Sequence, residues 1–176
     1  MLSDEQLMMR AARGDMEAFE ALVEQRQQDA LNIAYRFLGD RTLAEDVVQD
    51  AFLKILAGAA RYRPTARFRT YLYNVLWRLC VDIYRRRSPA QLDALEPGES
   101  DGPSPEQAAL ADERALLVRR AVDELPPRQR MALVLKHFEG LSYEETGRAL
   151  DCSASAVDAL LSRARARLKE RLEGLL

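Results

Sequence analysis

The segment spanning residues 125–172 constrains the fold of this chain most, because it encodes two helices joined by a tight turn. Ser142 precedes Glu145 by three residues, a capping-box pattern that starts a short helix, which we predict over residues 143–150. Asp151 tolerates the left-handed backbone that a tight turn between helices requires. Together with the longer helix that follows, this order is typical of a helix-turn-helix unit, whose second helix enters the DNA major groove.

The longer helix, predicted over residues 154–172, has one apolar and one polar face at helical spacing. Ser153 or Ser155 can cap its start. The apolar stripe consists of Val157, Leu160, Leu161, Ala164 and Leu168. The opposite face carries Asp158, Ser162, Arg163, Arg165 and Arg167. This basic face suits DNA, although an ordinary helical hairpin with solvated arginines explains the same pattern and stays an alternative.

Proline, glycine and acidic residues divide the chain into two parts. Residues 88–106 hold four prolines and two glycines with few large apolar side chains, so we predict a flexible acidic linker there. The predicted domains on either side comprise residues 1–87 and 107–176. Neither contains a strand pattern, which predicts an all-α protein of two small helical domains.

Capping patterns predict where the helices of the N-terminal domain begin. The expected starts are Ser3 with Gln6, Asp15 for a helix reaching about Leu38, and Thr42 with Glu45. A further helix is predicted over residues 66–87, and Pro105 suits the first position of the helix that opens the second domain.

Charge is unevenly distributed along the 176 residues, although the formal net charge is only −2. Residues 61–87 carry eight basic side chains and one acidic side chain, whereas residues 88–125 carry nine acidic and three basic side chains. A basic segment of this kind favours a polyanion, since neutralised phosphates release counterions. The acidic balance elsewhere lowers the affinity for DNA unless another protein supplies part of the contact.

The chain shows no signal of membrane insertion, secretion, metal binding or catalysis. No apolar run reaches the roughly 18 residues of a membrane span and no signal-peptide pattern occurs, so we expect a cytoplasmic location. Cys80 and Cys152 lack a metal-spaced partner, so we expect core or near-core thiols rather than a disulfide or zinc site. The single histidine, His137, has no catalytic partner pattern, so we expect neither an enzyme nor a cofactor.

A cluster of polar side chains lies on one face of the helix predicted after Thr42. Its apolar face consists of Val47, Val48, Ala51, Phe52, Ile55 and Leu56. The polar cluster consists of Glu45, Asp46, Gln49 and Asp50. These residues lie near the positive end of the helix dipole, so a solvated helix start explains them as well as a binding face does.

Aromatic and basic residues alternate between residues 61 and 87. The aromatic residues are Tyr62, Phe68, Tyr71, Tyr73, Trp77 and Tyr84, and the basic ones include Arg61, Arg63, Arg67, Arg69, Arg78 and Arg85. Single-stranded nucleic acid requires this combination, because cations bind its backbone and aromatic rings stack on its bases. Helical spacing nevertheless predicts that part of the segment is core, namely Phe68, Leu72, Val75, Leu79 and Ile83.

Three segments in this order resemble the sigma-70 family of bacterial transcription initiation factors, specifically the small two-domain extracytoplasmic-function (ECF) group. Residues 14–56 look like the segments with which these factors bind core polymerase. Residues 67–87, RFRTYLYNVLWRLCVDIYRRR, resemble the promoter-melting helix, and residues 125–172 resemble the C-terminal domain. The resemblance spans nearly the whole chain, and the three motifs together across a proline-rich linker are highly specific.

The resemblance implies partners and roles for particular residues. It implies binding to core RNA polymerase, through the β′ clamp helices and the β flap, as well as promoter DNA and an anti-sigma factor. The implied clamp-binding residues are Glu45, Asp46, Gln49 and Asp50. Those implied at the −10 element are Arg61, Tyr62, Arg63, Arg67, Arg69, Tyr71, Arg78 and Arg85. Those implied at the −35 element are Arg148, Ser155, Asp158, Ala159, Ser162, Arg163 and Arg165.

Several positions depart from the family pattern. Tyr71 stands where many ECF members have tryptophan, and Arg78 stands where they have asparagine. Asp151 occupies the turn where glycine is frequent, and Gly147 stands where the first helix often has alanine; both substitutions are sterically plausible. Asp158 on the second helix can accept a hydrogen bond from a cytosine amine or repel phosphates.

Two other classes of protein explain part of the sequence. A stand-alone helix-turn-helix regulator explains the C-terminal segment but leaves the acidic cluster and the basic aromatic segment without a joint purpose. A sigma mimic that sequesters an anti-sigma factor needs the fold but not DNA binding. Promoter opening in the presence of purified core polymerase separates all three classes.

Overall fold

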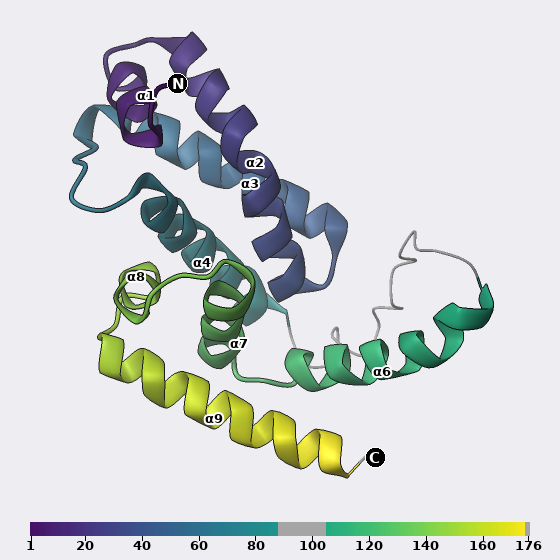
Figure 1. Ribbon diagram of the computed structural model, residues 1–176. Helices are drawn as coiled ribbons and strands as arrows, with labels where there is room; N and C mark the ends of the chain where they lie inside the picture. Colours follow the sequence, from purple (N-terminus) through teal and green to yellow (C-terminus); the bar gives the residue numbers. More distant parts are fainter. Residues whose placement is uncertain (88–104, 175–176) are drawn as a thin grey trace.

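The computed structural model of this chain describes residues 1–87 and 105–174, and its regular elements in these two ranges are helices (Figure 1). The first range contains α1 (Asp4–Ala11), α2 (Met16–Leu38), α3 (Arg41–Ala57), the short η1 (Ala59–Arg61) and α4 (Phe68–Arg86). The second contains α6 (Pro105–Asp123), α7 (Pro127–Leu133), η2 (Val134–Phe138), α8 (Tyr143–Ala149) and α9 (Ala154–Glu173). The predicted all-α fold class is confirmed.

The predicted linker, residues 88–106, lies almost entirely outside the described residues. Its last two residues belong to α6, which begins at Pro105 as the proline signal predicts. Proline costs no hydrogen bond there, since the first amide of a helix has no partner within the helix.

The starts of the first two helices are confirmed. Ser3 and Gln6 form the reciprocal capping box of α1, and the Asp15 carboxylate accepts a hydrogen bond from the Ala18 amide at the start of α2. Gly39 ends α2 in the left-handed conformation, with φ of 71°. Glycine adopts this conformation without the steric cost of a side chain, so the chain can turn into α3.

The predicted capping box of Thr42 and Glu45 is wrong. Asp40 caps α3 instead, and its carboxylate accepts a hydrogen bond from the Leu43 amide at 3.0 Å. Thr42 lies inside the helix, one residue past its start, and Glu45 pairs with Arg41 at 3.0 Å. Asp40 precedes Thr42 by two residues, and either side chain can accept a hydrogen bond from the free amides at a helix start. The local sequence pattern is therefore compatible with a helix that begins after Asp40 or after Thr42.

The start of α4 receives its cap from a distant helix. Arg67 precedes the first residue and makes no capping hydrogen bond through its side chain. The Glu5 carboxylate of α1 accepts a hydrogen bond from the Phe68 amide at 2.8 Å. This hydrogen bond lowers the pKa of Glu5, and α4 begins at Phe68 rather than at the predicted Ala66.

The buried face of α4 is broader than its spacing predicted. The fully buried residues of this helix are Phe68, Thr70, Leu72, Tyr73, Leu76, Trp77 and Cys80. Phe68 and Leu72 were predicted to be core, whereas Val75, Leu79 and Ile83 are only half-buried. The reason is that α4 packs against α2 and α3 on one side and against α7 and α8 on the other.

The helix-turn-helix unit is confirmed. Ser142 and Glu145 form the capping box of α8, Ser153 caps α9, and Asp151 between them has a φ of 55°. On α9, Val157, Leu161 and Ala164 are buried, and Leu160 and Leu168 are half-buried. The predicted polar face of α9, at residues 158, 162, 163, 165 and 167, is exposed.

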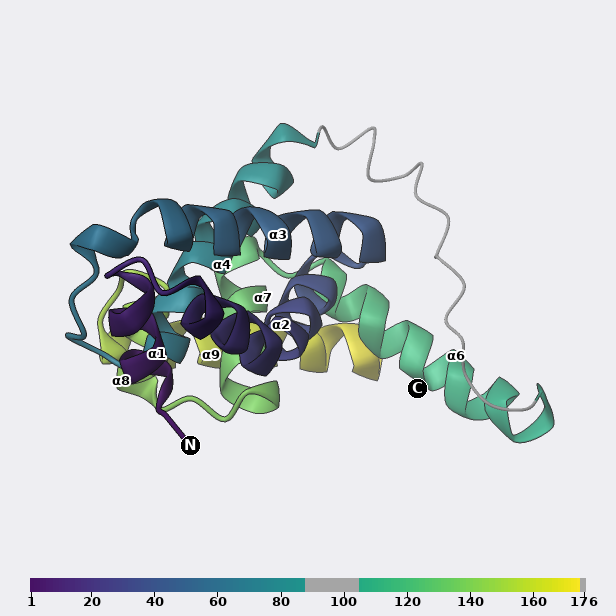
Figure 2. The same cartoon turned by 90° about the horizontal axis from the view of Figure 1, so that it is seen from above.

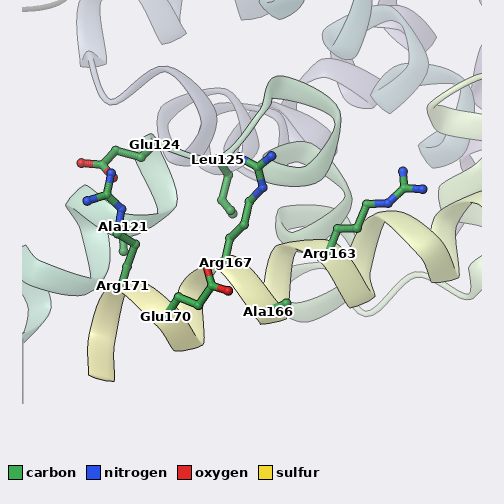
Figure 3. Close-up of a pocket in the computed structure, with 8 residues that line it drawn as sticks. All are labelled: Ala121, Glu124, Leu125, Arg163, Ala166, Arg167, Glu170 and Arg171. Carbon is green, nitrogen blue, oxygen red and sulfur yellow. The ribbon is translucent and has the colours of Figure 1, made fainter. Parts of the chain in front are cut away.

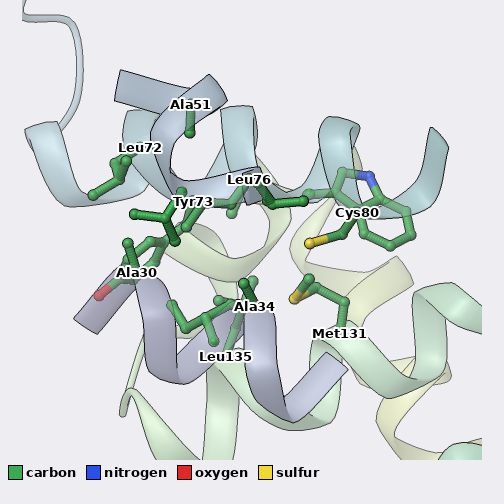
Figure 4. Close-up of a cluster of buried hydrophobic side chains, with 14 of the residues drawn as sticks. Ala30, Ala34, Ala51, Leu72, Tyr73, Leu76, Cys80, Met131 and Leu135 are labelled. Carbon is green, nitrogen blue, oxygen red and sulfur yellow. The ribbon is translucent and has the colours of Figure 1, made fainter. Parts of the chain in front are cut away.

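The two halves of the chain share one hydrophobic core. Helices α7 and α8 lie beside α4, while α9 lies on the side of α7 and α8 that faces away from it (Figures 1 and 2). Met131 and Leu135 of the second half are fully buried in the same cluster as Ala34, Leu76 and Cys80 of the first (Figure 4). The linker composition predicted two domains but not that they would dock.

Candidate nucleic-acid interface and protein-docking face

The polar cluster on α3 is fully exposed. Glu45, Asp46, Gln49 and Asp50 all lie on the surface, opposite the buried residues that fix α3 against α2 and α4. Glu45 is engaged by Arg41. Asp46, Gln49 and Asp50 make no side-chain hydrogen bond or ion pair within the described part of the chain, so their oxygens are available to a partner with cationic side chains.

A basic cleft of about 580 Å³ lies beside the start of α4. From the first half its walls include Lys54, Arg61, Tyr62, Arg63, Tyr71 and Asn74. From the second half they include Arg148 and Asp151. Four of the residues predicted for the −10 element therefore lie together in this cleft. Lys54 and Asn74 line the cleft as well, and no sequence motif singles out either residue.

Tyr62 packs within a cluster of aromatic rings at the edge of this cleft. Its ring centroid lies 5.6 Å from that of Tyr71 and 6.4 Å from that of Phe68. Burial raises the pKa of Tyr62 to about 12, and its hydroxyl makes no hydrogen bond within the described residues. The ring thus supports the loop that carries Arg61 and Arg63, both of which are exposed.

The remaining predicted −10 residues follow α4. Arg67, Arg78 and Arg85 are exposed, and Arg69 is half-buried. Two of them face carboxylates of the second half: Arg78 lies 3.2 Å from Asp151, and Arg67 lies 3.8 Å from Glu145. The cationic face of α4 is therefore partly occupied by the helix-turn-helix unit.

The predicted −35 residues divide between two places. Ser155, Asp158, Ser162, Arg163 and Arg165 are exposed and Ala159 is half-buried, all on α9. Arg148 lies apart from them, because α8 directs it to the basic cleft beside α4. The structure thus brings all of the predicted −35 residues together on one helix except Arg148.

A groove between the end of α6 and the C-terminal part of α9 contains further arginines of the second half. Arg163 and Arg167 line it together with Leu125 (Figure 3). At its end Arg171 contacts Glu124 at 2.5 Å. Of the two α9 arginines predicted at the −35 element, Arg163 therefore borders this groove, whereas Arg165 does not.

Arg130 holds the two halves together where α2, α6 and α7 meet, and sequence reasoning missed it. Its guanidinium is buried and donates hydrogen bonds to the carbonyl oxygens of Phe37, Asp123 and Leu125. It also lies over the Phe37 ring, 5.2 Å from the centroid. Burial lowers the pKa of this guanidinium, and the carbonyl oxygens compensate for its desolvation.

Family models match both halves of the sequence. Residues 22–89 match the model of Sigma-70 region 2, and residues 115–168 match that of Sigma-70, region 4. The chain is 35% identical to the RNA polymerase sigma-H factor of Pseudomonas aeruginosa, over 98% of this chain and 95% of that protein. It is 32% identical to the ECF RNA polymerase sigma-E factor of Escherichia coli, over 99% of this chain and 97% of that one.

Two solved structures that this chain resembles are complexes of two proteins. CnrH in complex with the cytosolic domain of CnrY has a TM-score of 0.74 and 28% identity, over 97% of both chains. The sigma factor RpoE in complex with the anti-sigma factor NepR from Bartonella quintana has a TM-score of 0.65 and 25% identity, over 88% of this chain and 96% of that one.

An exposed polar cluster on α3, a basic cleft and a helix-turn-helix unit on one helical scaffold are typical of a DNA-binding factor that works with a protein partner. The chain belongs to the sigma-70 family, in the ECF group of RNA polymerase sigma factors, which function in transcription initiation. No helix within residues 1–87 and 105–174 is long and apolar enough to cross a membrane.

Proposed function

We propose that this sigma factor binds core RNA polymerase through the exposed polar face of α3, melts the −10 element with the cleft beside α4, and reads the −35 element with α9. The observation that carries the proposal is that Asp46, Gln49 and Asp50 are exposed while the opposite face of α3 is buried. The fold does not need these side chains for its own packing, so they are free to orient a partner.

The α3 face would bind the β′ clamp helices of the polymerase. Carboxylates on a rigid helix give charge-assisted hydrogen bonds to arginine or lysine of a partner, and these bonds fix the orientation of the complex. Glu45 already pairs with Arg41, but this exposed ion pair contributes little free energy. Glu45 can therefore exchange Arg41 for a cationic side chain of a partner.

The cleft beside α4 would hold the non-template strand of the −10 element. Lys54, Arg61 and Arg63 supply cations for its phosphates, and Tyr71 supplies a half-buried ring beside them. Base stacking on an aromatic ring contributes about 1 to 3 kcal/mol per base, and only after the strands have separated. The cleft would therefore favour open over closed promoter DNA.

The exposed face of α9 would enter the major groove at the −35 element. Ser155, Asp158, Ala159 and Ser162 lie towards the start of the helix, where base edges are contacted in helix-turn-helix proteins, and Arg165 is placed to reach the backbone. The β flap of the polymerase would bind the same C-terminal domain.

A cytoplasmic anti-sigma factor would bind this chain as well. Both solved neighbours are complexes, CnrH with the cytosolic domain of CnrY and RpoE with the anti-sigma factor NepR, and both cover most of this chain. A partner that clasps both halves would keep them in the arrangement described here.

The core-binding assignment is tested by the double substitution Asp46→Arg with Gln49→Ala. We expect a loss of affinity for core polymerase in a binding titration, because an arginine repels cationic side chains of the clamp. Exposed positions such as these change stability by about 0.5 kcal/mol or less. Glu24→Arg, at an exposed position of α2, is the matched control. Equal affinity of both variants would remove α3 from the docking surface.

The melting assignment is tested by Arg61→Ala with Arg63→Ala in transcription with purified core polymerase. We expect near-normal closed complexes but weaker opening, because these cations contact the strand only after it separates. A promoter with a pre-melted bubble should restore most of the activity. Permanganate reactivity of thymines near −10 reports opening directly, and normal reactivity on duplex DNA would move the melting surface elsewhere on α4.

A further inference from the structure

We propose that α1 takes part in melting the −10 element: Glu5 is a positioning residue that holds the start of α4, and with it the loop of residues 62–67, in place for the separated strand. The effect on promoter opening rests on the −10 role proposed above. The positioning itself rests on the contacts between α1 and α4. The match to the region 2 model begins at residue 22 and therefore does not include α1.

The start of α4 has no cap from its own preceding residue. The Arg67 side chain makes no capping hydrogen bond. The Phe68 amide donates instead to the Glu5 carboxylate, at 2.8 Å from nitrogen to oxygen. The first turn of α4 closes on the Arg67 carbonyl, which accepts hydrogen bonds from the amides of Thr70 and Tyr71. A helix start whose first amides lack partners frays, so Glu5 fixes where α4 begins.

Helix α1 is itself held firmly within the first half. The Asp4 carboxylate, next to Glu5 in the sequence, is buried and accepts a hydrogen bond from the Arg26 guanidinium of α2 at 2.7 Å. Leu7 and Met8 are buried in the core. Two consecutive carboxylates of α1 therefore bind two different helices. The attachment of Asp4 to α2 gives Glu5 a position that does not depend on α4.

Three aromatic rings connect this cap to the basic cleft. The Phe68 side chain is fully buried, and its ring centroid lies 6.4 Å from that of Tyr62 and 6.1 Å from that of Tyr71. Tyr62 and Tyr71 line the cleft. Because protein interiors leave little free space around a buried ring, a movement of the Phe68 backbone would displace both tyrosines.

The loop between η1 and α4 has few backbone attachments of its own. Residues 63–65 and Arg67 are exposed. The backbone hydrogen bond described within the loop, from the Thr65 amide to the Arg63 carbonyl at 2.8 Å, is local. The path of the loop is therefore set by its two ends. Its arginines can meet phosphates of the separated strand in a defined place only while the Phe68 end is held.

Amide hydrogen exchange of the full chain, measured by NMR, tests the positioning. In Glu5→Ala we expect the Phe68 amide to exchange about fivefold faster than in the wild type, the factor that corresponds to the loss of one helix cap. The control is Asp15→Ala, which removes the cap of α2 in the same half and should leave the Phe68 rate unchanged. Equal Phe68 rates in the two variants would contradict the proposal.

Transcription with purified core polymerase tests the effect on melting. For Glu5→Ala we expect normal closed complexes and promoter opening about fivefold slower than with the wild type, and a pre-melted bubble should restore the activity. Asp15→Ala loses a cap of the same kind and should open the promoter as the wild type does. A purely structural role of Glu5 would impair both variants alike, so equal opening rates would overturn the proposal.

Glu5→Gln separates the hydrogen bond from the charge, because its amide oxygen can still accept from Phe68. We expect Phe68 exchange and promoter opening close to those of the wild type. Slow opening together with wild-type Phe68 exchange would refute the positioning role, since the charge rather than the cap would then act. If Glu5→Ala loses helical circular dichroism, Glu5→Asp takes its place, because the shorter side chain withdraws the carboxylate from the amide.

Failure of the −10 role is distinguishable from failure of the positioning. Normal promoter opening by Arg61→Ala with Arg63→Ala would reject the role of the loop in melting. Exchange of the Phe68 amide in Glu5→Ala and Asp15→Ala would still decide whether Glu5 holds the start of α4.

Discussion

Gly147 in α8 and Asp151 in the turn that follows show what a single position reveals in a sequence. Asp151 was predicted to adopt a left-handed conformation, and it has a φ of 55°. The steric need for glycine at position 147 was not predicted, because it depends on the path of the following turn. A Cβ on Gly147 would lie 2.6 Å from the Cys152 carbonyl oxygen, so alanine is not compatible with this turn as it stands.

Gly147→Ala should therefore lower the stability of the chain. In an exposed helix the same change raises stability by about 1 kcal/mol. Here the added methyl group meets backbone, so we expect a loss of roughly 1 to 3 kcal/mol in urea unfolding.

Gly58→Ala is the comparison for this change. A Cβ at Gly58 would lie 3.4 Å from the nearest atom, the Lys54 carbonyl oxygen, so we expect a much smaller effect there. A stabilised Gly147→Ala chain would mean that the turn is looser than described.

At the scale of elements, most of the helices and their caps follow from local patterns. The capping residues Ser3, Asp15 and Ser142 were predicted, and Ser153 was one of two candidates for the cap of α9, because a side-chain oxygen near its own helix is visible in the sequence. The cap of α4 was not predicted. Glu5, which accepts the hydrogen bond from the Phe68 amide, lies 63 residues away in the sequence. The π-helical turn of η2, which precedes Glu139, also lacks a local signal.

Glu5→Ala should destabilise the chain by about 1 kcal/mol, because it leaves the first amide of α4 without its cap. The folded chain lowers the pKa of Glu5, chiefly through the Phe68 hydrogen bond. The stabilisation that the Glu5 carboxylate gives to the folded chain is therefore present above the ordinary pKa of 4.5, and it is lost as the pH falls through the lowered pKa.

Urea unfolding of the Glu5→Ala chain and the wild type at neutral and acidic pH checks this expectation. The difference between them should shrink in acid. Glu20→Ala, at an exposed position of α2, should show no such dependence on pH. A constant difference across the pH range would show that the Glu5 charge does not cap α4.

At the scale of the whole molecule, the sequence predicted two helical domains but not their docking. Tyr73 was one of the aromatic residues of a segment predicted to suit single strands, but its hydroxyl donates to Glu139 of the second half. The neighbouring Asn74 amide donates to the Ala149 carbonyl, also in the second half. Docking depends on complementary surfaces more than 60 residues apart, for which helical periodicity carries no information.

The docked arrangement should become more stable as the pH falls towards 4.5. Burial between the halves raises the pKa of Glu139, so the docked state favours the protonated carboxyl group. The stabilisation of the docked arrangement by protonated Glu139 is fully present below the ordinary pKa of 4.5, and it is lost as the pH rises through the raised pKa.

Glu139→Gln should remove this dependence, because the amide oxygen still accepts from Tyr73 and carries no charge. Urea unfolding midpoints of both chains between pH 4.5 and 8 provide the measurement. The wild-type midpoint should fall more steeply with rising pH than that of Glu139→Gln. Parallel curves would show that Glu139 is not buried by docking.

The shared core also limits how this chain can change over generations. A residue such as Met131 or Cys80 must suit neighbours from both halves, so a replacement acceptable to its own half can spoil the fit with the other. The same holds for Arg78 and Asp151, which are matched in charge. Exchanging one half for that of a relative would combine two surfaces that have not changed together. We therefore expect the two halves to be exchangeable only as a matched pair, even where their DNA contacts could vary independently.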